Sequence, residues 1–156
     1  MAQELKALED WAGAFLEKLS PPERKRLAAQ VARSLRTTNT RRMTQQQAPD
    51  GSRWEARKPP PPAKGRSKPR FAVKTGPMMA KLKRAKALQA KGQTDGAVVE
   101  FLGRAQRVAR VHHFGETDNV NPGRGPRYDY PARELLGYGD EDLDKLRTLV
   151  LQHLKL

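Results

Sequence analysis

The spacing of apolar residues predicts a helical hairpin at the start of the chain. Over residues 1–19 the apolar side chains recur every three or four positions, as they do along one face of a helix. A second stripe follows Ser20-Pro21-Pro22-Glu23, which can cap a helix start because Glu23 stands at the capping-box distance from the serine. The apolar positions are Leu5, Leu8, Trp11, Ala12, Phe15, Leu16 and Leu19, then Leu27, Ala28, Val31 and Leu35. We predict helices over residues 1–47, with Trp11 in the core.

The next stretch contains residues that end a helix and keep the chain extended. Ala48-Pro49-Asp50-Gly51-Ser52 is typical of a tight turn, because proline fixes one dihedral and the Asp-Gly pair tolerates positive ones. The prolines 59–62 cannot donate ladder hydrogen bonds and favour an extended conformation. We therefore predict an extended, basic, proline-rich arm over residues 58–69.

Residues 70–156 read as a mixed α and β region. We expect a short strand at Arg70–Lys74, a basic helix over Pro77–Lys91 that Gly92 ends, a β-hairpin, a long loop and a final helix. The hairpin strands are Ala97–Leu102 and Gln106–Phe114, and the loop is Glu116–Arg127. The final helix begins at Asp140, where acidic residues face unpaired amides, and turns Leu143, Leu146, Leu149, Val150 and Leu154 inward. The fold class is α+β, in a single domain of 156 residues.

Charge is concentrated in the middle of the chain. The whole sequence carries +14, but residues 20–91 hold most of the basic residues and few of the acidic ones. Such a stretch can neutralise the phosphates of nucleic acid, dock on an acidic protein surface, or keep a solvated arm soluble. Composition leaves these three alternatives open.

Residue patterns typical of catalysis are absent from the sequence. There is no cysteine, and no serine lies in a Gly-x-Ser-x-Gly turn. If His112 and His113 lie on a strand they point to opposite faces and cannot share one metal ion. The acidic residues Asp140, Glu141, Asp142 and Asp144 are accounted for by a helix start and by solvation. We therefore expect no catalytic, cofactor or metal site, and no apolar run is long enough to span a membrane.

Two blocks of the sequence resemble the phage virion morphogenesis (tail-completion) family of contractile-tailed phages such as Mu and its relatives. One block runs from Ala109 to Leu154 and contains Ala-Arg-Val-His-His-Phe-Gly, Tyr-Pro-Ala-Arg-Glu-Leu-Leu-Gly and an Asp-Leu-x-x-Leu helix. The other, Gln45–Lys58, is similar to the family's signature of glutamine, Pro-Asp-Gly, an aromatic and basic residues. The family pattern usually has His-Gln where this chain has His112-His113.

The resemblance implies an assembly protein rather than an enzyme. Such a protein acts late in tail assembly, as a homo-oligomeric ring, most simply six-fold, at the head-proximal end of the tail. Its expected partners are tail tube, sheath terminator or connector proteins, its place is the tail or neck of the virion, and it assembles in the cytoplasm of the bacterial host. The expected interface residues are Trp54, Arg57, His112, His113, Phe114, Gly115, Tyr130, Pro131 and Arg133. A DNA-binding assembly factor acting through the basic segment is the main alternative, and an enzyme is a weaker one.

Overall fold

The computed structural model describes residues 2–58, 76–121 and 123–154. Apart from Lys58, the predicted arm over 58–69 and the predicted strand at 70–74 lie outside the described residues. Within the described ranges the chain forms four helices and two antiparallel hairpins. The elements are α1 (Ala2–Leu16), α2 (Pro21–Gln45), β1 (Leu88–Gly92), β2 (Ala97–Phe101), α3 (Arg104–Phe114), β3 (Thr117–Asn121), β4 (Arg124–Asp129) and α4 (Asp140–His153). The α+β class predicted from the sequence is confirmed.

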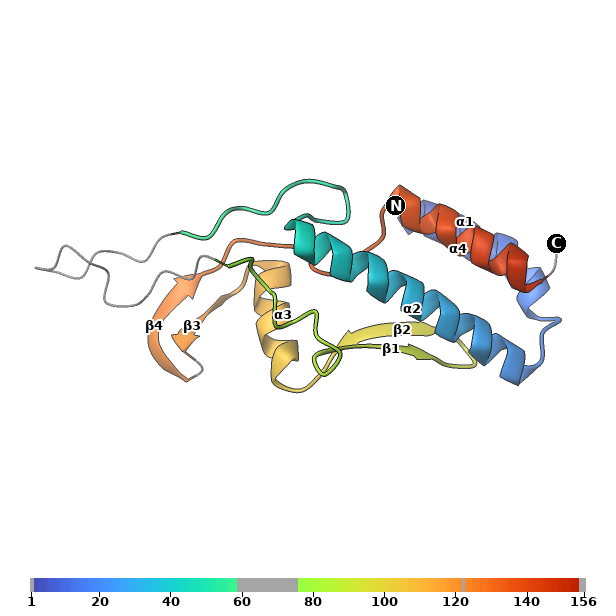
Figure 1. Cartoon of the computed structure of the whole chain (residues 1–156), viewed down its shortest axis with the longest axis horizontal. Helices are drawn as coiled ribbons and strands as arrows, with labels where there is room; N and C mark the ends of the chain where they lie inside the picture. Colours follow the sequence, from blue (N-terminus) through green and yellow to red (C-terminus); the bar gives the residue numbers. More distant parts are fainter. Residues whose placement is uncertain (1, 59–75, 122, 155–156) are drawn as a thin grey trace, which may run out of the picture.

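The long helix α2 separates two layers (Figure 1). The helices α1 and α4 lie on one side of it and the β1–β2 hairpin on the other, while α3 and the β3–β4 hairpin extend toward the end remote from the chain termini. The predicted start of α2 is confirmed, since the Ser20 amide donates to Glu23 Oε2 at 2.9 Å and prolines occupy the first helical positions. The helix ends at Gln45, and the residue that follows it, Gln46, has a φ of +59°.

The β1–β2 hairpin packs directly on the backbone of α2. Arg36 on the helix donates from Nε to the Leu88 carbonyl at 2.9 Å, which fixes the start of β1. At the other end of the strand, a Cβ on Gly92 would lie 2.3 Å from the Ala29 backbone nitrogen. Only glycine allows an approach this close. The hairpin therefore holds a defined position along the helix.

Three clusters of buried side chains make the core. The first joins α2, the segment before β1, β2, α3 and the residues before α4, and it contains the fully buried Met43, Leu88 and Leu135. The other two join α1, α2 and α4 through Leu8, Leu35, Leu143 and Leu146, and through Ala12, Leu27 and Val150. The predicted inward face of α4 is confirmed at Leu143, Leu146 and Val150, with Leu149 and Leu154 partly buried. Trp11, predicted to be core, is instead 42% exposed on the outer face of α1.

The predicted helix over Pro77–Lys91 is wrong. Residues 78–87 form successive turns, and β1 follows from Leu88 to Gly92, so Gly92 ends a strand. Met79 has a φ of +61°, which interrupts any helix at that point. The buried positions Leu82, Ala87 and Leu88 also lack helical spacing.

The predicted strand Gln106–Phe114 and the predicted loop Glu116–Arg127 are also wrong. The first is helix α3, flanked by Gly103 and Gly115 at positive φ, and the second contains most of the β3–β4 hairpin. Ala105 and Ala109, four residues apart, turn one face of α3 toward the first core cluster. The strand partner of β2 is therefore β1 and not residues 106–114.

Candidate assembly interface

The segment between β4 and α4 is held in place by Arg133. Its guanidinium donates from Nε and Nη2 to the carbonyl oxygen of Glu55, at 2.9 and 2.8 Å, and its own amide donates to the His112 carbonyl at 2.7 Å. The side chain is almost fully buried. Arg133 thus joins this segment to the Trp54 region and to the end of α3, through carbonyl oxygens and not through a carboxylate.

Two further contacts connect the same parts of the chain. The indole Nε1 of Trp54 donates to the Glu134 carbonyl at 3.2 Å, and Nδ1 of His113 accepts the Leu135 amide at 3.1 Å. Trp54 is buried in the first core cluster. It packs within its own chain.

Close backbone approaches lock the two sequence blocks together. A Cβ on Gly137 would lie 2.6 Å from Pro49 Cγ, and a Cβ on Gly139 would lie 2.8 Å from the Pro49 carbonyl oxygen. Likewise, a Cβ on Gly115 would lie 2.8 Å from the Ala132 nitrogen. The Pro-Asp-Gly turn and the Pro-Ala-Arg segment are therefore parts of one packed unit.

Gln46 holds the segment that precedes β1 in place. Its side-chain amide donates to the carbonyls of Met43 and Met78, and its Oε1 accepts the Met78 amide at 2.9 Å. A glutamine at the end of a helix thus satisfies backbone groups of a segment more than thirty residues away. The sequence gives no sign of this contact.

A buried ion pair joins α2 to the start of α4. Arg42 Nη1 lies 2.5 Å from Asp142 Oδ2, the same oxygen that accepts the Gly139 amide at 2.8 Å. Arg42 Nη2 donates to Asn39 Oδ1 and to the Gly137 carbonyl, and Asn39 Oδ1 also accepts the Gly137 amide. Asp142 is 1% exposed. The helix-start role predicted for Asp142 is confirmed, but its pairing with Arg42 was missed because the two residues are 100 positions apart.

Phe114 is the most exposed large apolar side chain in the described part of the chain, at 67%. It is the last residue of α3, and it borders two open hollows of about 470 and 780 Å³. The first hollow lies against the Trp54 and Glu134 region and the second between α3 and β3. Burying an exposed apolar side chain against another protein is favourable, so this surface is a candidate for contact with another protein.

Ion pairs hold β3 beside α3 next to Phe114. Arg107 pairs with Asp118 in two-pronged fashion at 2.5 and 3.1 Å, and Arg110 pairs with Glu116 at 3.0 Å. The pairs are exposed and contribute little stability each. Their effect is to set the direction of the β3–β4 hairpin relative to the end of α3.

His112 lies in a surrounding that disfavours its charge. Burial, followed by the positive charges of Arg133 and Arg57, lowers the pKa of His112 from 6.5 to about 4. Its ring packs edge-on against Tyr130, with 4.8 Å between ring centroids. The imidazole is therefore neutral at pH 7.

This pKa predicts a loss of stability on acidification. In the unfolded chain His112 takes up a proton near pH 6.5, whereas in the fold it does so only near pH 4. The unfolded state binds more protons between these values, so stability falls as pH drops from 6.5 to 4. The loss is about 1–2 kcal/mol, below the roughly 3 kcal/mol of the full shift because the side chain is partly exposed. Urea unfolding of wild type and His112→Gln at pH 7 and pH 4.5 measures it, and an equal loss in both proteins would contradict the assignment.

The structure brings most of the sequence-predicted interface residues together but gives them different roles. Trp54 and Arg133 are buried and structural, while His112, His113, Tyr130 and Pro131 lie half-buried around them. Gly115 provides the close approach to Ala132, Phe114 is exposed, and Arg57 lies at the surface. His112 and His113 were predicted to point to opposite faces of a strand. Because α3 is a helix, they do not.

Several cations of the basic segment take part in the fold. Arg42 is buried, Arg36 bonds to β1, Arg41 pairs with Glu141, Lys83 donates to Thr44 and Lys91 pairs with Glu100. Part of the positive charge of this segment is therefore neutralised by ion pairs within the protein. Among the residues the structure places, no group of His, Asp or Glu is arranged to hold a metal ion. None of the helices it describes is long and apolar enough to cross a membrane.

Comparison with known proteins connects this geometry to a family. Residues 3–155 match the sequence model of the phage virion morphogenesis family. The chain is 36% identical, over 157 aligned residues, to tail completion protein S of Escherichia phage P2. The alignment covers 97% of this chain and 98% of that protein. No solved structure gives a significant match.

Proposed function

The chain belongs to the phage virion morphogenesis family, and we propose on this basis that it is a structural protein that completes phage tails. It assembles as a closed ring at the head-proximal end of the tail and makes the tail competent to join the head. The observation that carries the proposal is the full-length similarity to a tail completion protein. The protein is a component of the virion tail and carries out no reaction.

The packed unit around Arg133 supports this function. The blocks that resemble the family, Gln45–Lys58 and Ala109–Leu154, contact each other through Arg133, Trp54 and the Pro49 turn. These contacts leave Phe114 exposed at the end of a rigid helix. A pre-formed apolar contact on a rigid support loses little entropy on binding, which suits docking onto a tube, sheath terminator or connector protein.

A ring follows from the symmetry of the tail that it completes. Subunits arranged head to tail close into a ring when their rotation matches the tail, most simply with six-fold symmetry. The ring forms in the cytoplasm of the bacterial host, where tails are built. Its free face then meets the head.

DNA binding is the second candidate. The observation that favours it is the excess of basic residues between 20 and 91. The five cations that contact other parts of the fold reduce the charge available for phosphates. Non-specific contact with DNA fits a protein located where DNA passes from head to tail, as an addition to the assembly role and not as its replacement.

The exposed Phe114 provides a test in the assembled particle. Phe114→Ser should leave tails that form at normal yield but join heads at least about tenfold less often, because a central apolar contact is lost without a change in the core. Particle counts by electron microscopy and plaque titres of a complemented mutant measure it. Gln152→Ser, at an exposed site on α4, is the control and should act like wild type. Full infectivity with Phe114→Ser would refute this role of the surface.

A further inference from the structure

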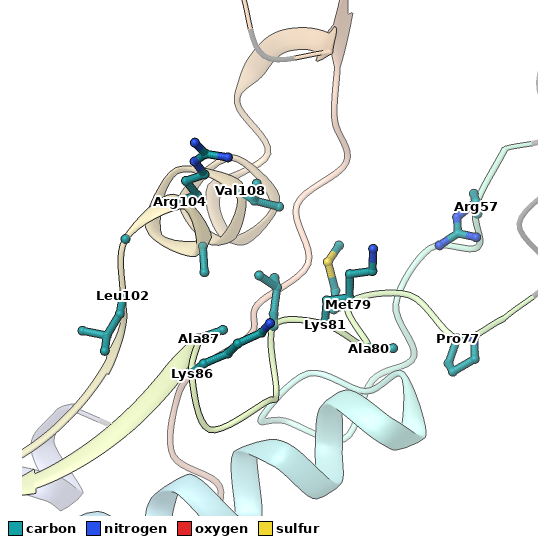
Figure 2. A pocket seen from close by; sticks show the side chains of 13 residues that line it. Arg57, Pro77, Met79, Ala80, Lys81, Lys86, Ala87, Leu102, Arg104 and Val108 are labelled. Carbon is teal, nitrogen blue, oxygen red and sulfur yellow. The ribbon is translucent and has the colours of Figure 1, made fainter.

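An open groove of about 700 Å³ lies between the turns before β1 and the start of α3 (Figure 2). Most of its lining is apolar, including Met79, Leu82 and Val108. Its charged lining residues are all cations: Arg57, Lys81, Lys86 and Arg104. The surface therefore combines apolar contact area with a positive field.

Three of these cations have no acidic partner in the described part of the chain. Lys81, Lys86 and Arg104 form no ion pair with any residue placed by the structure, and Val108 is 42% exposed. An occupant that is both apolar and acidic would bind such a lining favourably, because it would bury the apolar side chains and neutralise the cations together.

The outer face of α1 has the matching properties. Trp11 is 42% exposed and lies beside Phe15, with 6.0 Å between ring centroids. Glu9 and Asp10 are exposed on the same helix and Glu17 follows its end, while the adjoining face packs through Leu8 and Ala12 into the core and Lys18 Nζ lies 5.9 Å from the centre of the Phe15 ring. Residues 1–19 carry a net charge of −2, from four acidic and two basic residues. An exposed tryptophan is typical of a surface that is covered in an assembly, and the acidic residues beside it complement the cations of the groove.

The two surfaces lie on different sides of the molecule, so they cannot meet within one subunit. Figure 1 shows α1 beside α4 on one side of α2, with α3 and the segment before β1 on the other. We propose that the groove of one subunit receives the outer face of α1, around Trp11, from a second copy of this chain. Because the two patches differ, the contact is head to tail and repeats from subunit to subunit until a ring closes.

The charge of the groove favours this occupant over two others. Residues 59–75 of the same chain contain five basic residues and no acidic one, so the groove repels them. Duplex DNA would use the cations but would leave the apolar lining exposed, and no aromatic side chain in the lining is placed to stack on a base. The inference rests on the ring in the proposed function and identifies the surfaces that build it.

Two variants, each with one altered surface, test the contact. The groove variant carries Lys81→Glu and Arg104→Glu, and the helix variant carries Asp10→Ser and Trp11→Ser, which removes the acidic and aromatic side chains without adding a positive charge that the altered groove could bind. In sedimentation velocity the wild type should form a closed oligomer, and each variant alone should associate at least about 30-fold more weakly. An equimolar mixture of the two should form a dimer and nothing larger, because one intact helix then meets one intact groove. That dimer also shows that both variants are folded.

Each other outcome overturns the inference. If each variant alone forms rings like the wild type, the protein forms a ring, but its subunits do not meet through the groove and the outer face of α1. If the mixture stays monomeric while Lys86→Glu, a milder groove variant with an unchanged melting temperature, assembles normally, the groove is not the contact. A wild type that is monomeric alone contradicts the contact, and imaging of complete tails then decides separately whether a ring forms there. If the groove variant loses duplex DNA binding and keeps its oligomeric state, the occupant is nucleic acid.

Discussion

Replacing Asp142 with alanine is expected to destabilise the protein by about 3–5 kcal/mol, the largest effect of any single change considered. The substitution removes the carboxylate that lies 2.5 Å from Arg42 and leaves the guanidinium buried without a counter-charge. It also removes the acceptor for the Gly139 amide at the start of α4. For a chain of this length the melting temperature should fall by about 10–20 °C, as measured by calorimetry or circular dichroism.

Three controls separate the charge from the cap. Asp144→Ala, at an exposed position of the same helix, should change stability by less than about 0.5 kcal/mol. Asp142→Asn keeps an acceptor for Gly139 but not the charge, and it should lose most of what alanine loses. The double variant Arg42→Met with Asp142→Leu should recover a large part of the loss, because it removes both charges. A cost below about 1 kcal/mol for Asp142→Ala would contradict the assigned role.

Replacing Arg133 with alanine is expected to cost about 2–4 kcal/mol and to reduce virion yield. The side chain is buried, and its loss leaves the Glu55 carbonyl without both of its guanidinium donors. The segment between β4 and α4, which packs against Gly115 at the end of α3, then loses its attachment to the Trp54 region. Thermal unfolding should show a decrease of about 5–15 °C.

Arg133→Lys is the matched variant for this position. A lysine keeps the charge but offers a point donor in place of the planar fork, so it should recover only part of the stability. Arg124→Ala, at an exposed position in β4, should leave melting and yield unchanged. If Arg133→Ala melted like wild type and gave normal yields, the account of the packed unit would be wrong.

The long helices were predictable because their apolar residues recur with the period of a helix. Helices α1, α2 and α4 each show apolar residues at three- and four-residue spacing, and Ser20 with Glu23 marks a start that the hydrogen bonds confirm. The exposure of Trp11 was not predictable in the same way. A stripe shows which face is apolar, but only the packed neighbours show how much of that face they cover.

The shorter elements failed for an identifiable reason. Residues 106–114 contain valines and a phenylalanine, which favour strands, yet Val108 and Val111, like Ala105 and Ala109, have helical spacing, and tertiary contacts decide between the two. The sequence did contain a relevant signal, since Gly115 stands where a helix often ends in the left-handed region. In residues 77–91 the helical pattern was overridden by the turn at Met79 and by pairing of β1 with β2.

The candidate site was partly predictable. The Pro-Ala-Arg and Pro-Asp-Gly motifs indicated which parts of the chain to examine, and Arg133 was among the expected interface residues. The pairings of Arg133 with Glu55 and of Arg42 with Asp142 join positions 78 and 100 residues apart, and no local pattern encodes them. The predicted domain boundaries and the predicted extended arm over residues 58–69 stay predictions.

The proposed ring at the head-proximal end of completed tails can be looked for by cryo-electron microscopy. Tails purified from cells that make the wild-type protein are compared with tails from cells that lack it. We expect a ring of density at the head-proximal end that fits this fold and is missing from the deficient tails, which then fail to join heads. Completed tails that lack such a ring, or that carry the protein at the opposite end, would contradict the proposed function.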